Sequence, residues 1–367
     1  MSEKKRIPIP EGITQESLQP QVEMLQLKRR PNKLFIGIPK EASKKEHRVA
    51  LVPASVALLT GKGHRIVMEM GAGEMANYSD HRLSEAGAEI AYDKEQVFKA
   101  NLILKLSPPT LEEIDLLRPG QVIISPLHLP IVTAEILHRL KEKRVIAVAL
   151  EHIKDEEGGF PVVRIMSEIA GSCAMLTAAD LMTNSRGGKG VLLGGVSGVP
   201  SAKVVILGAG VVAEFATRTA LGLGAEVRIF DNNIYKLMRI QNRVGRKLNT
   251  SSLIPFQLEK ELMSADVAIG AMHSKTGRTP IIVSEDTVSK MKPGSVIVDV
   301  SIDQGGCFAT SEVTSLEAPT FVKHEVIHYC VPNIASKVAR TSSIAISNIF
   351  TTMLSKMAGS SNFEATI

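Results

Sequence analysis

Aromatic residues are scarce in this sequence, which has no tryptophan, four tyrosines and ten phenylalanines among 367 residues. Nucleic-acid surfaces usually combine clustered Lys and Arg with aromatic side chains. The net charge is +5, but residues 1–33 alone hold seven Lys and Arg against four Glu. Because the remaining sequence is nearly neutral and has no basic–aromatic pattern, we predict no nucleic-acid partner.

Cysteine is also rare, with three residues at positions 173, 307 and 330 and no Cys-x-x-Cys pair. This spacing indicates neither a disulfide framework nor a structural zinc site, so we predict no metal. No uncharged apolar run reaches the roughly 18 residues that a membrane span needs. The start of the chain also lacks the apolar core of a signal peptide. We therefore expect a cytoplasmic protein without membrane association.

The most informative stretch covers residues 203–231 and reads KVVILGAGVVAEFATRTALGLGAEVRIFD. Residues 204–207 form a continuous apolar run, which is typical of a strand buried on both faces. Gly208 and Gly210 then permit a tight turn in which backbone N–H groups can approach an anion. Helical spacing follows, and the third position of the turn is the small residue Ala213, which permits close helix–strand packing.

An acidic residue completes this pattern. A second strand at 226–230 ends at Asp231, which follows Gly208 by 23 residues. A carboxylate at this distance can accept hydrogen bonds from ribose hydroxyls and would repel a 2′-phosphate. The stretch therefore predicts a site for NAD rather than NADP, and a glycine-rich turn without a ligand is the alternative.

Apolar strands alternate with helical segments along most of the chain. We expect strands at 34–39, 65–70, 101–106, 121–127, 145–151, 204–207, 226–230, 267–271, 295–300 and 330–331. We expect helices at 52–60, 83–86, 97–100, 111–117, 131–140, 166–182 and 341–358, besides the one after the glycine turn. This alternation predicts parallel sheets with right-handed crossovers.

The chain is too long for one ordinary core. We therefore predict an α/β fold with two Rossmann-like domains separated by an active-site cleft. The domains are expected at 34–163 plus 340–367 for the substrate and at 164–339 for NAD, after a basic N-terminal arm at 1–33.

Further motifs occur in order over residues 34–358: IGIPKE…EHRVALVP, GAGE, LILKL…PP, LRPGQV…LHL, MSEIAG, GGKGVLLGGVSGVP, the GAG turn, VDVSIDQGGCF and HYCVPN. Together they resemble the alanine dehydrogenase family, which is related to the NAD(H)-binding component of nicotinamide nucleotide transhydrogenase. The resemblance implies an NAD-dependent deamination of L-alanine, or of a related small amino acid, to the oxo acid and ammonia. It also implies a symmetric homo-oligomer, a hexamer or smaller.

The resemblance assigns substrate and proton-transfer roles. Arg48 in EHRVALVP would hold the substrate carboxylate, with Lys105 beside it. His128 of the LHL motif and Asp303 of the IDQGG motif would form the acid/base pair. Deamination needs a group with a pKa near neutrality beside a carboxylate, and a guanidinium group suits a carboxylate bidentately. The alternatives are a strand-end histidine, a surface arginine and a turn carboxylate.

The resemblance also assigns cofactor contacts beyond the glycine turn and Asp231. Ser167 in MSEIAG would face the phosphates, Lys236 would lie on the adenosine side, and Asn333 would lie near the nicotinamide.

Two departures from the family pattern affect the substrate site. The family has a second lysine two residues after the one matched by Lys105, and Ser107 replaces it here. The loop after the strand at 267–271 contains His273, Lys275 and Arg278 where the family has a Val-Pro-Gly-like sequence.

Ser107 leaves an alternative function open. An NAD(H)-binding paralogue with weak or no dehydrogenase activity is the alternative to an alanine dehydrogenase. The transhydrogenase component is disfavoured because that relative lacks the histidine of the LHL motif.

Overall fold

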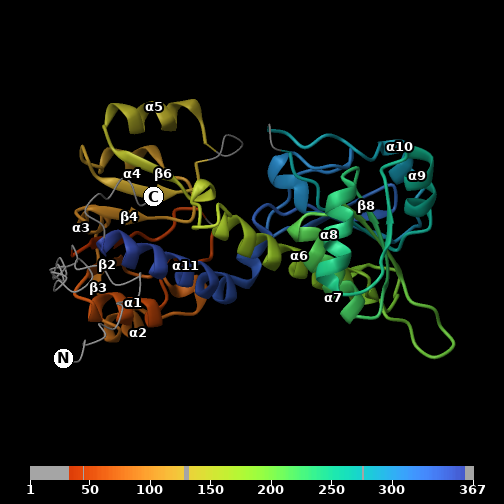
Figure 1. Ribbon diagram of the computed structural model, residues 1–367, viewed down its shortest axis with the longest axis horizontal. Helices are drawn as coiled ribbons and strands as arrows, with labels where there is room; N and C mark the ends of the chain where they lie inside the picture. Colours follow the sequence, from red (N-terminus) through yellow and green to blue (C-terminus); the bar gives the residue numbers. More distant parts are fainter. Residues whose placement is uncertain (1–32, 44, 128–131, 275–276, 360–367) are drawn as a thin grey trace, which may run out of the picture.

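The computed structural model describes residues 33–43, 45–127, 132–274 and 277–359. Two sheets form two lobes, and the long helix α6 (Pro161–Leu181) lies between them (Figure 1). Of the predicted features, the N-terminal arm up to residue 32, His128 and Lys275 lie outside the described residues.

The first sheet has the strand order β3-β2-β1-β4-β5-β6, with all neighbours parallel. Its strands are β1 (Phe35–Ile38), β2 (Arg65–Glu69), β3 (Glu89–Ala91), β4 (Leu102–Leu104), β5 (Val122–Ser125) and β6 (Ile146–Ala149). The helices of this lobe are α1 (Pro53–Gly61), α2 (Asp80–Glu85), α3 (Lys94–Val97), α4 (Leu111–Asp115) and α5 (Ala134–Glu142), with short turns η2 (Glu74–Ala76) and η3 (Leu150–His152).

The second sheet has the order β12-β13-β11-β10-β7-β8-β9 and is parallel except for the β12–β13 pair. Its strands are β7 (Lys203–Leu207), β8 (Glu226–Phe230), β9 (Asn249–Ser251), β10 (Val267–Gly270), β11 (Val296–Asp299), β12 (Thr320–Lys323) and β13 (Val326–Tyr329). Its helices are α7 (Val211–Gly222), α8 (Ile234–Val244), α9 (Pro255–Met263) and α10 (Glu285–Ser289), with turns η4 (Asn184–Arg186), η5 (Val300–Gln304) and η6 (Ile334–Val338). The predicted α/β class with two Rossmann-like, mostly parallel sheets is confirmed.

Helix α6 belongs to both hydrophobic cores. Val162 and Met166 near its start pack into the core of the first lobe, whereas Ala174 and Ala178 are buried in the core of the second. The helix is long and apolar enough to cross a membrane by length and composition alone, with a mean hydropathy of 1.3. Its place in two cores accounts for that apolar character within the folded chain.

The C-terminal helix α11 (Ala339–Gly359) returns to the first lobe, where it is drawn in blue in Figure 1. Ile346, Phe350 and Leu354 on one face of the helix are buried in the core of the first sheet. The last described segment of the chain therefore completes the lobe that the first strand begins. The residue boundaries of the two domains stay a prediction.

Two sequence predictions of secondary structure are wrong. The strand expected at 330–331 lies earlier, at Val326–Tyr329, because His328 interrupts an otherwise apolar pattern. Its ring is nevertheless buried, since it bonds to Thr310 Oγ1 and to the carbonyl oxygen of Val326. The helix expected at 97–100 is also displaced, because α3 ends at Val97.

Candidate functional site

Serine hydroxyls of the C-terminal segment hold the loop that carries Arg48. Three backbone N–H groups of this loop donate to them: His47 to Ser336 at 2.9 Å, Val49 to Ser343 at 2.9 Å and Val52 to Ser347 at 3.0 Å. Ser343 and Ser347 are one helical turn apart on α11, so they lie on the same face. These bonds satisfy backbone donors that the loop cannot satisfy itself.

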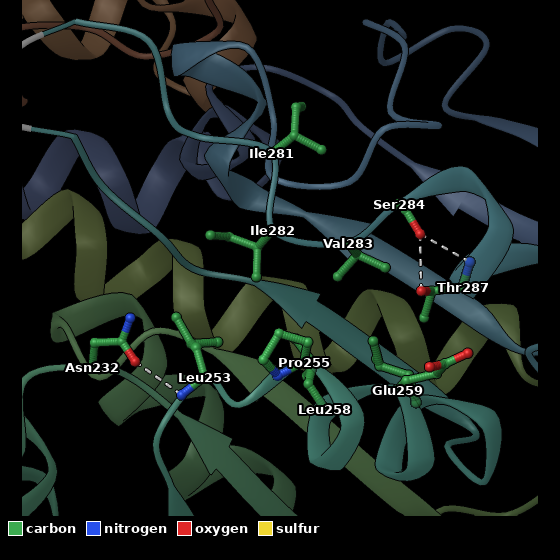
Figure 2. A pocket seen from close by; sticks show the side chains of 11 residues that line it. Asn232, Leu253, Pro255, Leu258, Glu259, Ile281, Ile282, Val283, Ser284 and Thr287 are labelled. Carbon is green, nitrogen blue, oxygen red and sulfur yellow. Dashed lines mark hydrogen bonds between the residues drawn. The ribbon is translucent and has the colours of Figure 1, made fainter.

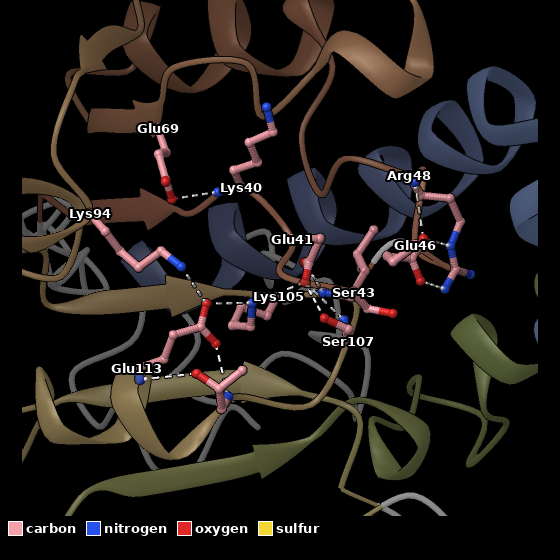
Figure 3. A network of polar contacts seen from close by, with 12 residues as sticks. Lys40, Glu41, Ser43, Glu46, Arg48, Glu69, Lys94, Lys105, Ser107 and Glu113 are labelled. Atoms are coloured by element: carbon pink, nitrogen blue, oxygen red, sulfur yellow. Dashed lines mark hydrogen bonds and ion pairs between the residues drawn. The ribbon is translucent and has the colours of Figure 1, made fainter.

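Arg48 forms a bidentate ion pair with Glu46. Its Nε donates to Oε1 at 2.6 Å and its Nη2 to Oε2 at 2.5 Å, and only 8% of the arginine is exposed. Burial lowers the pKa of Arg48, but the charge and hydrogen bonds of Glu46 outweigh it and raise the pKa, with smaller contributions from Glu41 and Asp303. The guanidinium therefore stays charged in a desolvated site (Figure 3).

Asn333 connects this pair to the second lobe. Its side-chain Nδ2 donates to Glu46 Oε2 at 2.9 Å, and its backbone N–H donates to Asp303 Oδ1 at 3.0 Å. Asn333 has φ 56°, a left-handed conformation that Asn tolerates better than most residues. The structure thus brings together Arg48, Asp303 and Asn333, although Arg48 and Asn333 are 285 residues apart in the sequence.

Lys105 has different neighbours from those expected of a substrate contact. It is fully buried, and its Nζ pairs with Glu41 at 2.9 Å and with Glu113 at 3.2 Å. Burial lowers the pKa of Lys105, and Glu41 and Glu113 together raise it above the usual value. The ammonium group therefore pairs with the buried carboxylate of Glu113 and the partly buried carboxylate of Glu41 (Figure 3).

Ser107 belongs to the same polar network. Its Oγ donates to Glu41 Oε2, and the backbone N–H of Leu106 donates to Glu41 Oε1 at 2.6 Å. A serine at this position supplies a hydrogen bond to Glu41 but no positive charge. The substrate roles of Lys105 and Ser107 stay predictions.

The glycine turn has the geometry that a phosphate site needs. Gly208 has φ 108°, and a Cβ there would stand 2.4 Å from the carbonyl oxygen of Ala271. By contrast, a Cβ at Gly210 would meet no atom of the described residues within 4 Å. Gly210 is the N-cap residue of α7 and provides no side-chain cap, and Ala213 in the first turn of the helix is fully buried. Open space beside an uncapped helix N-terminus is where backbone N–H groups can receive an anion.

Asp231 fixes the same turn from the end of β8. Its Oδ2 accepts the backbone N–H of Ala209 at 2.8 Å, and its Oδ1 accepts that of Asn233 at 2.8 Å. Lys236 Nζ lies 3.9 Å from Asp231 Oδ2. Ser167 lies on α6, where its hydroxyl donates to the carbonyl oxygen of Val163 at 2.7 Å.

The unusual loop after β10 is attached to the loop that carries Asp303. Ser274 N donates to Gln304 Oε1 at 2.9 Å, and Gln304 Nε2 donates to Ser274 O at 3.1 Å. Burial, and then the charge of Lys236, lowers the pKa of the neighbouring His273. The loop that departs from the family sequence therefore lies beside the loop of Asp303, a predicted catalytic residue, and near Lys236, a predicted cofactor contact.

A pocket of about 390 Å³ lies beside the end of β8 (Figure 2). It is lined by Asn232, which follows Asp231, and by mostly aliphatic side chains that include Leu253 and Ile282. Asn232 Oδ1 accepts the backbone N–H of Leu253 at 3.0 Å, which closes one wall. None of the predicted site residues within the described ranges lines this pocket.

Sequence reasoning missed two carboxylates of the site. Glu41 and Glu46 stand within the motifs quoted above, but neither was assigned a role. Glu46 stands two residues from Arg48, and this proximity was the available signal, whereas Glu41 stands 64 residues from Lys105 and no local signal linked the two. The structure shows that they neutralise Lys105 and Arg48.

Comparisons with known proteins show which family the chain belongs to. Residues 37–170 match the family model "Alanine dehydrogenase/PNT, N-terminal domain", and residues 174–367 match "Alanine dehydrogenase/PNT, C-terminal domain". The chain is 40% identical to an alanine dehydrogenase from Mycolicibacterium smegmatis over 86% of its own length and 85% of that protein. It is also 40% identical to an alanine dehydrogenase from Bacillus subtilis, over 86% and 83% of the two chains.

Solved structures give the same result. A structure of L-alanine dehydrogenase superposes with a TM-score of 0.83 at 36% identity, covering 89% of this chain and 90% of that one. A transhydrogenase from Sinorhizobium meliloti superposes with a TM-score of 0.77 at 25% identity, covering 88% and 94%. On the matches to both family domains and on this identity, the chain belongs to the alanine dehydrogenase/PNT family.

Proposed function

We propose that this protein catalyses the NAD-dependent oxidative deamination of L-alanine to pyruvate and ammonia, and the reverse reductive amination. The observation that carries the proposal is the junction of the lobes, where a buried arginine, a carboxylate and a left-handed asparagine meet. The alanine dehydrogenases that match most of the chain support the same substrate.

The cofactor proposal is NAD. The residues fit a dinucleotide, because a Cβ at Gly210 would occupy the open space beside the N-terminus of α7 and because Asp231 orders the turn. Gly208, Gly210, Ala213 and Ser167 would lie on the pyrophosphate side, Asp231 and Lys236 on the adenosine side, and Asn333 near the nicotinamide. When bound, NAD supplies the acceptor for the hydride that leaves Cα of the amino acid.

The residues of the chain supply the rest of the chemistry. Arg48 would bind the substrate carboxylate, since a charged guanidinium group donates to both oxygens. After oxidation at Cα, water adds to the imine carbon and ammonia leaves, so a proton must be removed from water and another given to the amine. Asp303 is the proposed carboxylate for these transfers, and His128, outside the described residues, is the proposed partner.

Ser107 does not alter this choice of function. The alternative, a paralogue with weak or no activity, has no support among the alanine dehydrogenases that match the chain. Within the site, the hydroxyl of Ser107 is one of several donors to Glu41, together with the ammonium group of Lys105 and the backbone N–H of Leu106.

We propose that the protein acts as a cytoplasmic homo-oligomer, up to a hexamer. Light scattering would measure the number of subunits.

The test is direct. The protein is mixed with NAD and L-alanine at alkaline pH, and the absorbance of reduced nicotinamide is followed. Formation of NADH and pyruvate is the expected result, and His128→Ala should abolish it with NADH affinity nearly unchanged. No turnover with a panel of small amino acids, despite measurable NADH binding, would contradict the proposed function.

A further inference from the structure

The guanidinium of Arg48 has two hydrogen-bonding edges, and they have unequal partners. Glu46 takes the Nε–Nη2 edge with two short bonds, at 2.6 and 2.5 Å. Among the residues that the structure describes, Nη1, on the other side, donates only to the thioether sulfur of Met166 at 3.0 Å. A thioether is a weak acceptor, so the Nη1 side of the guanidinium can still bind a carboxylate.

Glu46 is itself held in place by the second lobe. Its Oε2 accepts Asn333 Nδ2 at 2.9 Å, and its Oε1 accepts Ser336 Oγ at 3.4 Å. Its own backbone position in the Arg48 loop also lets Oε1 accept the N–H of Arg48 at 3.0 Å. With 6% of Glu46 exposed, this carboxylate is desolvated and is surrounded by donors from both lobes.

This arrangement fixes an otherwise flexible side chain. An arginine loses rotamer entropy when it is ordered, and an unpaired buried guanidinium would also carry a desolvation cost. Glu46 removes both penalties before a substrate arrives. Because it occupies the Nε–Nη2 edge, it does so without blocking the Nη1 side.

We propose that Glu46 is the positioning residue of the substrate site. It holds the Nε–Nη2 edge of Arg48 in a fixed orientation, so that Nη1 can bind the substrate carboxylate. Asn333 holds Glu46 in place through its side-chain hydrogen bond. This inference rests on the proposed function, in which Arg48 binds that carboxylate. It predicts that charge at position 46 controls affinity for carboxylate substrates, not for the cofactor.

The experiment uses the full-length protein and the variant Glu46→Gln. Glutamine has the same shape, but its NH₂ group cannot accept hydrogen bonds from Arg48 or Asn333. KM for L-alanine and the dissociation constant of pyruvate for the NADH-bound protein should each rise about tenfold or more. The NADH dissociation constant should stay within about twofold, and Glu46→Asp, which keeps the charge, should recover most of the pyruvate affinity.

The surface pair Arg65–Glu89 provides a matched control. Glu89 also binds an arginine through Nε and Nη2, at 2.7 Å for both bonds, but this pair is exposed and belongs to the neighbouring strands β2 and β3. Glu89→Gln should therefore leave pyruvate binding unchanged. Pyruvate binding is measured by calorimetry, so the result does not depend on turnover.

Each other outcome has a definite meaning. Unchanged pyruvate affinity in Glu46→Gln would overturn the inference, and tighter binding would show that Glu46 competes with substrate for Arg48. Equal losses of pyruvate affinity, NADH affinity and melting temperature would reduce Glu46 to a general structural role. If Arg48→Lys itself left pyruvate binding unchanged, the role of Arg48 in the proposed function would fail instead.

Discussion

The backbone N–H of Asn333 donates to Oδ1 of Asp303 at 3.0 Å, while the side chain of the same asparagine reaches Glu46 in the other lobe. One residue thereby sets the distance between the proposed proton-transfer carboxylate and the loop of the proposed substrate arginine. The bond to Asp303 uses the backbone, so it depends on the left-handed conformation of Asn333 and not on its side chain.

Variants at position 333 should separate these two contacts. Asn333→Gly keeps the left-handed backbone and loses only the amide, whereas Asn333→Ala must also carry strain of roughly 1 kcal/mol. We expect both variants to lose substrate affinity, with the alanine variant less stable by about that amount in urea unfolding. Equal stabilities would contradict the strain at this position.

Asp303→Asn should lower kcat by about 100-fold or more. An amide cannot accept a proton from water and return it to the amine, as a carboxylate can at the pH of the assay. The amide oxygen can still accept the N–H of Asn333, so the fold should persist. Steady-state kinetics and NADH fluorescence check the two parts. A wild-type kcat in this variant would exclude Asp303 as the proton-transfer residue.

Ser107→Lys should raise the turnover of L-alanine if the missing cation limits the reaction. The new ammonium group would lie beside Glu41, which already accepts hydrogen bonds from Lys105 and Ser107. Ser107→Ala is the control, since it removes the hydroxyl without adding charge. A fall in turnover in both variants would show instead that the hydroxyl bond to Glu41 is what the site requires.

The two glycines of the turn before α7 should respond differently to alanine. Gly208→Ala combines φ 108° with a Cβ 2.4 Å from a carbonyl oxygen, so it should destabilise the fold, with a lower melting temperature. The new methyl group in Gly210→Ala would meet no atom within 4 Å in the part of the chain that the structure describes, so this variant should leave the melting temperature unchanged. Its NADH affinity should fall about tenfold or more, because the methyl group enters the space proposed for the pyrophosphate. Full NADH affinity in Gly210→Ala would argue against that location.

Acid should destabilise the second lobe through His328. Burial, and to a smaller extent the charge of Lys323, lowers its pKa below the ordinary 6.5, against the opposing effects of the Val326 carbonyl, Asp299 and Glu312. Since Nδ1 must donate to that carbonyl, Nε2 of the neutral ring accepts the hydroxyl of Thr310.

The sign of this effect follows from the lowered pKa. The stabilisation is fully present above pH 6.5, the unfolded value, and is lost as the pH falls through the lower value of the folded state. Urea unfolding at pH 7.5 and pH 5 should show the loss, and His328→Gln should make it smaller. The same pH dependence in His328→Gln would assign the loss to other groups.

The sequence by itself determined the fold class and the glycine turn between β7 and α7. Both depend on short-range patterns: buried strands are continuous apolar runs, and the turn at Gly208 needs glycine because its backbone conformation and its neighbour Ala271 leave no room for a side chain. The position of Asp231 at the end of the second strand was predictable for the same reason, since it depends only on spacing along the chain. The local pattern gave the wrong position for the strand that contains His328. A histidine interrupts an apolar run in the sequence, but in the fold its ring is buried because both ring nitrogens form hydrogen bonds.

Only the tertiary structure decided how the charges of the site are paired. Lys105 is within two residues of Ser107 in the sequence, but its ammonium group is committed to Glu41 and Glu113, which stand 64 and 8 residues away. Arg48 is oriented by Glu46, and Glu46 is held by Asn333 across 287 residues. Ion pairs and hydrogen bonds of this kind depend on distances of about 3 Å in space, and such distances are set only when both lobes and the C-terminal helix have packed together.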